Sequence, residues 1–368
     1  MVIRNRSELQ EVHAGLLDAV TSLRRRAHVP GLSLAVVDRD RLVFAGGFGA
    51  ADLAGGRPAT PSTAYLWFSL SKLVTATAAL RLAEEGRLDL DAPVGTYVDH
   101  LTAPGPRQPT VRQLLDHTAG LANPLPIRWA HAAGDGAPDP AALLRRVMSR
   151  RRAYRYPVGE SARYTNLGYL AAGEVISTAA GRPFEEYVRQ AVLGPAGMHR
   201  TGFAYRPDAN AATGYVRAPR AADPVLRRLL PAGVAGPRHA GHLALNRFHV
   251  DGPAYGGLVG DVLDAGRFLR LHLGDGEIDG TRILRPETTR AMRELNRKGK
   301  PFDHGVGWFR RPTRGRGDWV EHLGTGAGFW NIMRLYPDRG LGVVVMTNST
   351  SGFDVEPLFE LLVEAPWS

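Results

Sequence analysis

The sequence predicts an α+β fold in which both ends of the chain contribute to one antiparallel sheet flanked by helices, while the middle forms an inserted, mainly helical lobe. Two observations lead to this prediction. Apolar, β-branched runs separated by short turns lie near both ends, and helical periodicity dominates between them. A length of 368 residues exceeds the usual size of a single domain, so a two-lobed unit with a large buried core is expected.

The first elements are a helix and a pair of strands. Apolar residues at helical spacing from Leu9 to Val20 predict the helix. Residues 31–37 and 42–46 are rich in apolar and β-branched side chains and predict two strands that turn at residues 38–40.

The last elements mirror the first. Residues 331–336 and 341–347 predict a second strand pair, and a closing helix is expected over 355–363. Proline- and glycine-rich loops interrupt the helical part at 102–110, 132–140 and 216–240.

This order of elements predicts two lobes. The sheet lobe is discontinuous and comprises residues 1–65 and 245–368. Residues 66–244 form the mainly helical lobe, and its loops are expected to border the substrate.

The composition excludes several classes of function. Apolar residues make up 44% and charged residues 22%, which is ordinary for a soluble globular protein. The net charge of +10 comes from scattered arginine without a long basic run, so no nucleic-acid partner is expected. The chain has no cysteine, which excludes disulfides, thiolate metal sites and cysteine nucleophiles. No apolar stretch predicts a membrane span and the first residues do not form a signal peptide, so we expect a cytoplasmic protein.

A Ser-x-x-Lys pair is the first candidate for chemistry. Lys72 is one of only three lysines in the chain and follows Ser69 by three residues. Apolar periodicity predicts a helix that ends near Gly86, which places Ser69 at its N-terminus and Lys72 on the same face. A lysine can lose its proton where an arginine cannot, so the pair suits a nucleophile and its base. Alternatively, the serine is a helix cap and the lysine a solvated residue of the first turn.

Two further motifs follow along the chain. Tyr164-x-Asn166 combines a phenol that can transfer protons with an amide that can hold a substrate carbonyl. The alternative is a turn in which Asn166 caps the next helix. His322-x-Gly324 lies at the edge of the C-terminal strand pair, and its position rather than its pattern makes it a candidate.

The order Ser-x-x-Lys, Tyr-x-Asn and His-x-Gly resembles the motifs of the serine β-lactamase and penicillin-binding protein superfamily. The resemblance is greatest to the class C β-lactamase-related group, which includes D-aminopeptidases, carboxylesterases and acyltransferases. It implies a β-lactamase/transpeptidase-like fold with the active site between the two lobes. Similar segments lie at residues 29–32, 69–91, 114–121, 166–169, 211–215, 256–258, 305–308 and 342–348.

The resemblance implies a role for each motif residue. Ser69 is the expected nucleophile, Lys72 its base and Tyr164 the proton shuttle to the leaving atom, although either Lys72 or Tyr164 could take the first proton. The backbone N–H groups of Ser69 and Thr325 are expected to form the oxyanion hole. The substrate-binding residues are expected to be Asn166, His322, Gly324 and Thr325.

One departure from the family pattern bears on the substrate. True class C β-lactamases have lysine where this chain has His322, and a mostly neutral histidine weakens the anchor for an antibiotic carboxylate. We therefore expect a serine hydrolase or acyltransferase that acts on an ester or amide of a small metabolite, with an alcohol or amine as a potential acyl acceptor. The loop from Val216 to His242, rich in arginine, proline and glycine, is expected to border the acyl or acceptor pocket. The alternatives are a β-lactamase or D-alanyl/D-amino-acid peptidase, and a catalytically silent binding or regulatory member of the fold.

Neither a cofactor nor a metal is expected. The sequence contains no Gly-x-Ser-x-Gly motif, so a Ser-His-Asp hydrolase is not expected. His117 lies in a helix-turn segment and is expected to be structural. His239, His242 and His249 lack the spacing of zinc ligands.

Overall fold

We describe the protein from a computed structural model. The structure describes residues 6–149, 153–312, 318–352, 354–365 and 367, with side chains from residue 15 onward. Within these residues, no helix is long and apolar enough to cross a membrane.

The two ends of the chain form one antiparallel sheet, as the sequence predicts. Across the described residues its strand order is β13-β14-β15-β1-β2-β3, and β1 pairs with β15 so that Leu34 lies opposite Val345. The strands are β1 (Gly31–Val37), β2 (Leu42–Asp52), β3 (Arg57–Pro58), β13 (Val320–Gly326), β14 (Phe329–Tyr336) and β15 (Leu341–Thr347). The predicted fold class is therefore confirmed. Strand β13 lies at an edge of the sheet, where its outer backbone groups can meet other elements.

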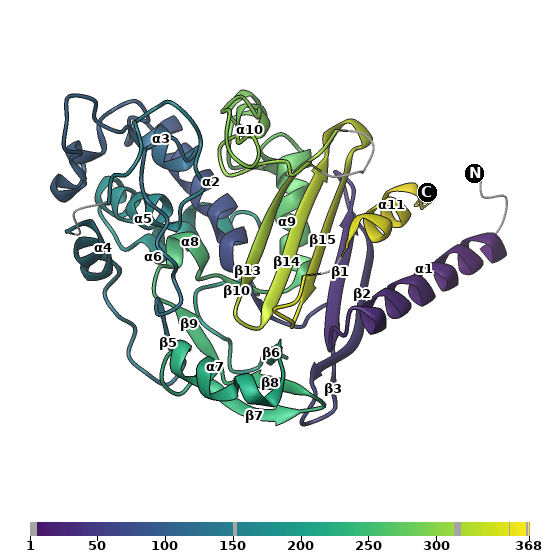
Figure 1. Ribbon diagram of the computed structural model, residues 1–368. Helices are drawn as coiled ribbons and strands as arrows, with labels where there is room; N and C mark the ends of the chain where they lie inside the picture. The colour runs from purple at the N-terminus through teal and green to yellow at the C-terminus, as the bar shows by residue number, and fades with distance from the viewer. Residues whose placement is uncertain (1–5, 150–152, 313–317, 353, 366, 368) are drawn as a thin grey trace.

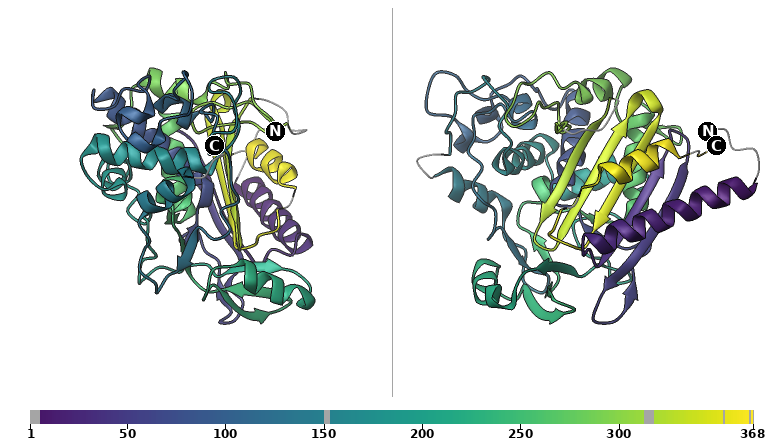
Figure 2. Two further views of the ribbon diagram at one scale, coloured as in Figure 1. Left: turned by 60° about the vertical axis from the view of Figure 1, so that its left-hand side comes forward. Right: turned by 45° about the vertical axis from the view of Figure 1, so that its right-hand side comes forward.

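Helices cover both faces of the sheet. Helices α1 (Arg6–Arg26) and α11 (Glu356–Glu364) lie across the outer face, and α9 (Val262–Leu273) packs on the inner face (Figures 1 and 2). Because side chains alternate along a strand, Leu32 and Leu34 join the outer apolar cluster while Ala35 and Val37 join the inner one. The inner cluster continues into the helical lobe, so one core joins the two lobes.

The middle of the chain is mainly helical, as predicted. Its α-helices are α2 (Ser71–Glu84), α3 (Val111–Leu115), α4 (Pro140–Met148), α5 (Asn166–Ala180), α6 (Phe184–Val188), α7 (Asp223–Leu229) and α8 (Pro253–Gly256). Single turns occur at η1 (Phe68–Leu70), η2 (Val94–Thr96), η3 (Asp99–Leu101), η4 (Arg189–Leu193), η5 (Arg220–Ala222) and η6 (Pro337–Arg339). Helix α10 (Pro286–Arg293) follows α9. The predicted end of α2 is confirmed, since Gly86 adopts a positive φ just beyond it.

The segment expected to be a loop over 216–240 contains regular structure instead. Strands β6 (Gly214–Arg217), β7 (Ala235–His239) and β8 (His242–Leu245) form a small sheet in which β8 pairs antiparallel with both β6 and β7, and α7 lies between β6 and β7 in the sequence. Among the described residues there are three further strand pairs. They are β4 (Tyr65–Leu66) with β10 (Val259–Gly260), β5 (Ala130–Ala132) with β9 (Phe248–Val250), and β11 (Glu277–Ile278) with β12 (Thr281–Arg282). The predicted lobe boundaries at 65/66 and 244/245 stay predictions.

Candidate active site

Ser69 lies in a tight turn directly before α2. This turn, η1, leads without a break into the helix, so the serine precedes the first α-helical residue by two positions. Phe68 has a φ of +49°, a conformation that side-chain-bearing residues rarely adopt. Such local strain is typical of functional sites and is held here by the surrounding packing. The Ser71 hydroxyl accepts a hydrogen bond of 3.1 Å from the N–H of Leu258, which anchors the start of α2.

Lys72 lies one helical turn later with its ammonium group inside the core. Its Nζ lies 3.0 Å from Ser69 Oγ, 2.8 Å from Asn166 Oδ1 and 3.0 Å from the carbonyl oxygen of Tyr255. The side chain is fully buried, and this burial holds the pKa of Lys72 well below that of an exposed lysine. Asn166 Oδ1 and the carbonyl oxygen of Tyr255 can only accept hydrogen bonds. A neutral Lys72 amine can therefore donate to both and accept the Ser69 proton with its lone pair.

Tyr164 and Asn166 flank the start of α5. The Thr165 hydroxyl caps this helix by accepting from the N–H of Leu167, which fixes the direction of both neighbours. The Tyr164 ring centroid lies 4.9 Å from Lys72 Nζ. Burial raises the pKa of Tyr164, and a hydrogen bond with Ser69 partly opposes this shift. Tyr164 is therefore a neutral phenol that can donate a proton.

Glycines allow the edge strand β13 to approach the serine turn. A Cβ on Gly324 would overlap the carbonyl oxygen of Trp67, and one on Gly326 would overlap the Phe68 ring. Gly324, the glycine of the His-x-Gly motif, therefore allows the backbone of β13 to lie close to the backbone before Ser69.

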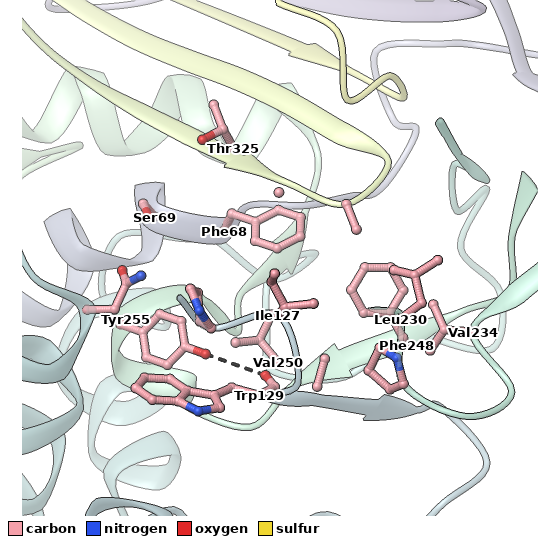
Figure 3. A pocket seen from close by; sticks show the side chains of 16 residues that line it. Phe68, Ser69, Ile127, Trp129, Leu230, Val234, Phe248, Val250, Tyr255 and Thr325 are labelled. Atoms are coloured by element: carbon pink, nitrogen blue, oxygen red, sulfur yellow. Dashed lines mark hydrogen bonds between the residues drawn. The ribbon is translucent and has the colours of Figure 1, made fainter. Parts of the chain in front are cut away.

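The backbone N–H of Thr325 points away from the sheet toward this turn. Glu321 exchanges two backbone hydrogen bonds with Phe309 on the side opposite β14. Backbone direction alternates along a strand, so Thr325, four residues later, points to the same side. Ser69 and Thr325 also line one cavity (Figure 3). The role of their two N–H groups as an oxyanion hole stays a prediction.

His322 lies next to the Tyr164 ring. It is fully buried, its ring centroid is 6.0 Å from that of Tyr164 and 4.7 Å from that of Phe309, and its Nδ1 lies 2.8 Å from the carbonyl oxygen of Leu323. Burial, followed by the proximity of Lys72, lowers the pKa of His322, so the ring is neutral. Neither His322 nor Gly324 is among the described residues that line the cavity, and their roles in substrate binding stay predictions.

Two more histidines complete the surroundings of Tyr164. The His117 Nδ1 accepts a hydrogen bond of 3.2 Å from the N–H of Thr165, and its ring lies 4.6 Å from the Tyr164 ring. His304 lies 5.0 Å from the His117 ring. The structural bonding expected of His117 is present, but the sequence did not reveal its contact with Tyr164. Among the described side chains, no group of three or more His, Asp or Glu is arranged to hold a metal ion.

A cavity of about 280 Å³ opens beside Ser69. The segment expected to border such a pocket does so, through Leu230, Pro231 and Val234. The apolar residues that form the remaining walls were not predicted from the sequence. A buried aromatic residue gives the same sequence pattern whether it lines a pocket or fills a core. The lining comprises Phe68, Ser69, Pro126, Ile127, Trp129, Ala130, Asn166, Leu230, Pro231, Val234, Phe248, Val250, Tyr255, Thr325, Gly326 and Ala327 (Figure 3).

Two positioning groups also escaped sequence reasoning. The carbonyl of Tyr255 carries no side-chain signal, yet it accepts from Lys72. The Asn123 Oδ1 accepts a hydrogen bond of 3.0 Å from the N–H of Asn166 and so holds the first turn of α5.

Comparisons with known proteins agree with this fold. A family model described as Beta-lactamase matches residues 16–365. Protein Rv1367c of Mycobacterium tuberculosis is 30% identical over an alignment that covers 78% of this chain and 71% of that protein.

Solved structures show the same architecture. The D-amino acid amidase from Ochrobactrum anthropi SV3, complexed with L-phenylalanine, has a TM-score of 0.78 and 22% identity, covering 95% of this chain and 97% of that one. EstCE1, a hydrolase with promiscuous acyltransferase activity, has a TM-score of 0.75 and 22% identity, covering 97% of this chain and 99% of that one. Identity at this level shows a shared fold, and the substrate must be argued from the site.

Proposed function

Because this chain belongs to the Beta-lactamase family, we propose that it is a serine hydrolase or acyltransferase that forms an acyl-enzyme at Ser69 from a small ester or amide. The observation that carries the proposal is the 3.0 Å approach of a buried Lys72 Nζ to Ser69 Oγ. The depressed pKa of Lys72 makes the amine available as a base.

In the acylation step, Ser69 Oγ attacks the substrate carbonyl carbon while its proton passes to Lys72 Nζ. The carbonyl electron pair moves onto oxygen, where the N–H groups of Ser69 and Thr325 stabilise the negative charge. Collapse of this intermediate breaks the bond to the leaving oxygen or nitrogen, which takes a proton from Tyr164. The Lys72 ammonium then returns a proton to the tyrosine oxygen.

The acyl-enzyme is released by the reverse sequence. Water, or an alcohol or amine acceptor, attacks the acyl carbon and gives up a proton to the same pair of groups. Ser69 leaves with its proton restored, so the enzyme regenerates without a cofactor. Hydrolysis and acyl transfer differ only in the nucleophile of this second step.

Ser69→Ala tests the proposal. We expect it to abolish turnover of p-nitrophenyl esters and labelling by a fluorophosphonate, whereas Ser62→Ala, which changes an exposed serine, keeps both. A panel of nitrocefin, D-amino-acid amides and esters, run with and without an alcohol acceptor, identifies the reaction type. Persistent labelling of Ser69→Ala would refute the nucleophile. An intact wild-type protein that is neither labelled nor active would favour the silent, binding member of the fold.

A further inference from the structure

The cavity beside Ser69 has an uncharged and largely apolar wall. Its described lining contains no Asp, Glu, Lys, Arg or His. The polar side chains of Ser69 and Thr325 lie at one end, near the proposed chemistry (Figure 3). Asn166 also lines the cavity, and its Oδ1 lies 2.8 Å from Lys72 Nζ. Toward the other end, the cavity is enclosed by segments distant in sequence, including Ile127, Leu230 and residues of β9.

Three polar groups close to this wall already have partners. Strand β9 is flanked by Arg247, whose guanidinium lies over the Tyr205 ring at 5.6 Å, and by Asp251, whose carboxylate lies 2.7 Å from His131 Nδ1. The Tyr255 hydroxyl donates to the carbonyl oxygen of Trp129 at 3.4 Å, as the dashed line in Figure 3 shows. A charged group placed in the cavity would therefore lose water without gaining a partner.

The position of Tyr164 indicates which half of the substrate enters the cavity. Tyr164 is the proposed proton donor to the leaving atom, yet it is absent from the described lining. A leaving group that reaches Tyr164 extends away from the cavity, and the acyl group on the other side of the carbonyl extends into it.

We propose that the acyl group of the substrate is a neutral, apolar alkyl or aryl chain that binds in this cavity, between Ser69 and the wall formed by Ile127, Leu230 and Phe248. This inference rests on the proposed function, because it assumes acylation at Ser69. It assigns the specificity of the enzyme to the acyl side and excludes acyl groups that end in a charge.

A substrate series measures this preference directly. With p-nitrophenyl esters, kcat/KM should rise about fourfold for each methylene that is buried, or about fifteenfold from acetyl to butanoyl. At equal chain length, hexanedioyl and 6-aminohexanoyl esters should react at least about a hundredfold more slowly than hexanoyl, because each buries an unpaired charge. Acetate esters of increasingly long alcohols provide the opposite series. Length dependence on the alcohol alone, or equal rates for the charged acyl groups, would overturn the inference.

A pair of variants places the effect in the cavity. Ile127 lines the cavity but is 42% exposed, so Ile127→Asp should fold and should lower the hexanoyl-to-acetyl ratio of kcat/KM at least about tenfold. Leu125, two residues earlier and 81% exposed, is outside the described lining, so Leu125→Asp should leave that ratio within about twofold. An equal change in both variants contradicts the assignment.

The outcomes separate the two proposals. If the acyl-length series is flat but Ser69 is still acylated, only the apolar acyl site fails. If Ser69 is never acylated by any ester, the proposed function fails first. Fluorophosphonate labelling of each variant, measured beside its turnover, distinguishes the two results.

Discussion

At the scale of single residues, the lysine at position 72 has a physical explanation in this fold. Arginine carries nearly all of the positive charge, and Lys72 is one of three lysines. The other two, Lys298 and Lys300, lie more than 200 residues further along the chain, whereas Lys72 is fully buried beside a serine hydroxyl. A buried lysine can titrate near neutral pH, but a guanidinium stays charged in any environment.

Lys72→Arg removes the base, because a guanidinium keeps its proton in any environment. We expect kcat/KM for an ester to fall by about 10²–10⁴-fold, because general-base assistance of the attack is lost. The matched control is Lys298→Arg, since that side chain is 86% exposed and should behave as the parent. Far-UV circular dichroism checks that both variants are folded. Parent-like acylation of a folded Lys72→Arg would show that Lys72 is not the base.

Tyr164→Phe distinguishes the two candidates for the first proton. The raised pKa of Tyr164 favours a proton donor, whose loss matters only when the leaving atom needs a proton. We therefore expect amide turnover to fall by about 10²–10⁴-fold, while a p-nitrophenyl ester, whose leaving group departs as an anion, falls by less than about tenfold. The measurement is kcat/KM for an ester and an amide of the same acyl group. Equal losses for both substrates would instead identify Tyr164 as the base.

At the scale of elements, the site depends on how closely β13 approaches η1. The edge strand carries the N–H of Thr325 and the turn carries that of Ser69, so in the proposed mechanism their separation determines the geometry of the oxyanion hole. Gly324 permits this approach because the carbonyl of Trp67 occupies the place of its missing side chain.

Gly324→Ala should therefore move β13 away from the serine turn. We expect kcat/KM to fall by about a hundredfold or more, with a larger effect on kcat than on KM, because the oxyanion donor is displaced. Gly134→Ala is the control, since an added Cβ there has no neighbour within 4 Å. Steady-state kinetics and thermal unfolding are measured on both. Parent-like kcat in Gly324→Ala would contradict this role of the glycine.

At the scale of the whole molecule, buried neutral histidines make the fold sensitive to acid. His272 on α9 is fully buried between the inner face of the sheet and the helical lobe, with its ring 4.7 Å from Phe268 and 5.2 Å from Trp308. Burial lowers its pKa to about 3. Between this value and about 6.5, where an unfolded histidine titrates, only the unfolded state binds the proton. Stability is therefore lost as the pH falls through this window.

His272→Phe removes this titration while retaining a ring. The quantity compared is the free energy of unfolding of the variant minus that of the parent. We expect this difference to be about 3 kcal/mol more favourable to the variant at pH 4 than at pH 7. Urea unfolding at both pH values measures the shift, and comparison with the parent cancels other titrating groups. His199→Phe, at an exposed position, serves as the control. If the difference between variant and parent is the same at both pH values, His272 is not the source of the acid sensitivity.

Much of the fold was predictable because its signals are local. Apolar runs with short turns predicted β1, β2, β14 and β15, and helical periodicity predicted α2. The small sheet within 214–245 was missed, since its three strands have only four or five residues each and are stabilised by pairing with one another. The spacing of Ser69 and Lys72 also anticipated their contact, because residues three apart share a helix face.

The sequence by itself determined the α+β class, the family and the pairing of Ser69 with Lys72. Only the tertiary structure decided the charge state of the lysine and the apolar character of the cavity. Lys72 is desolvated by groups from remote segments, including Asn166 and Tyr255, which lie 94 and 183 residues further along the chain. Burial and dielectric environment are properties of packed neighbours, so no local spacing encodes them.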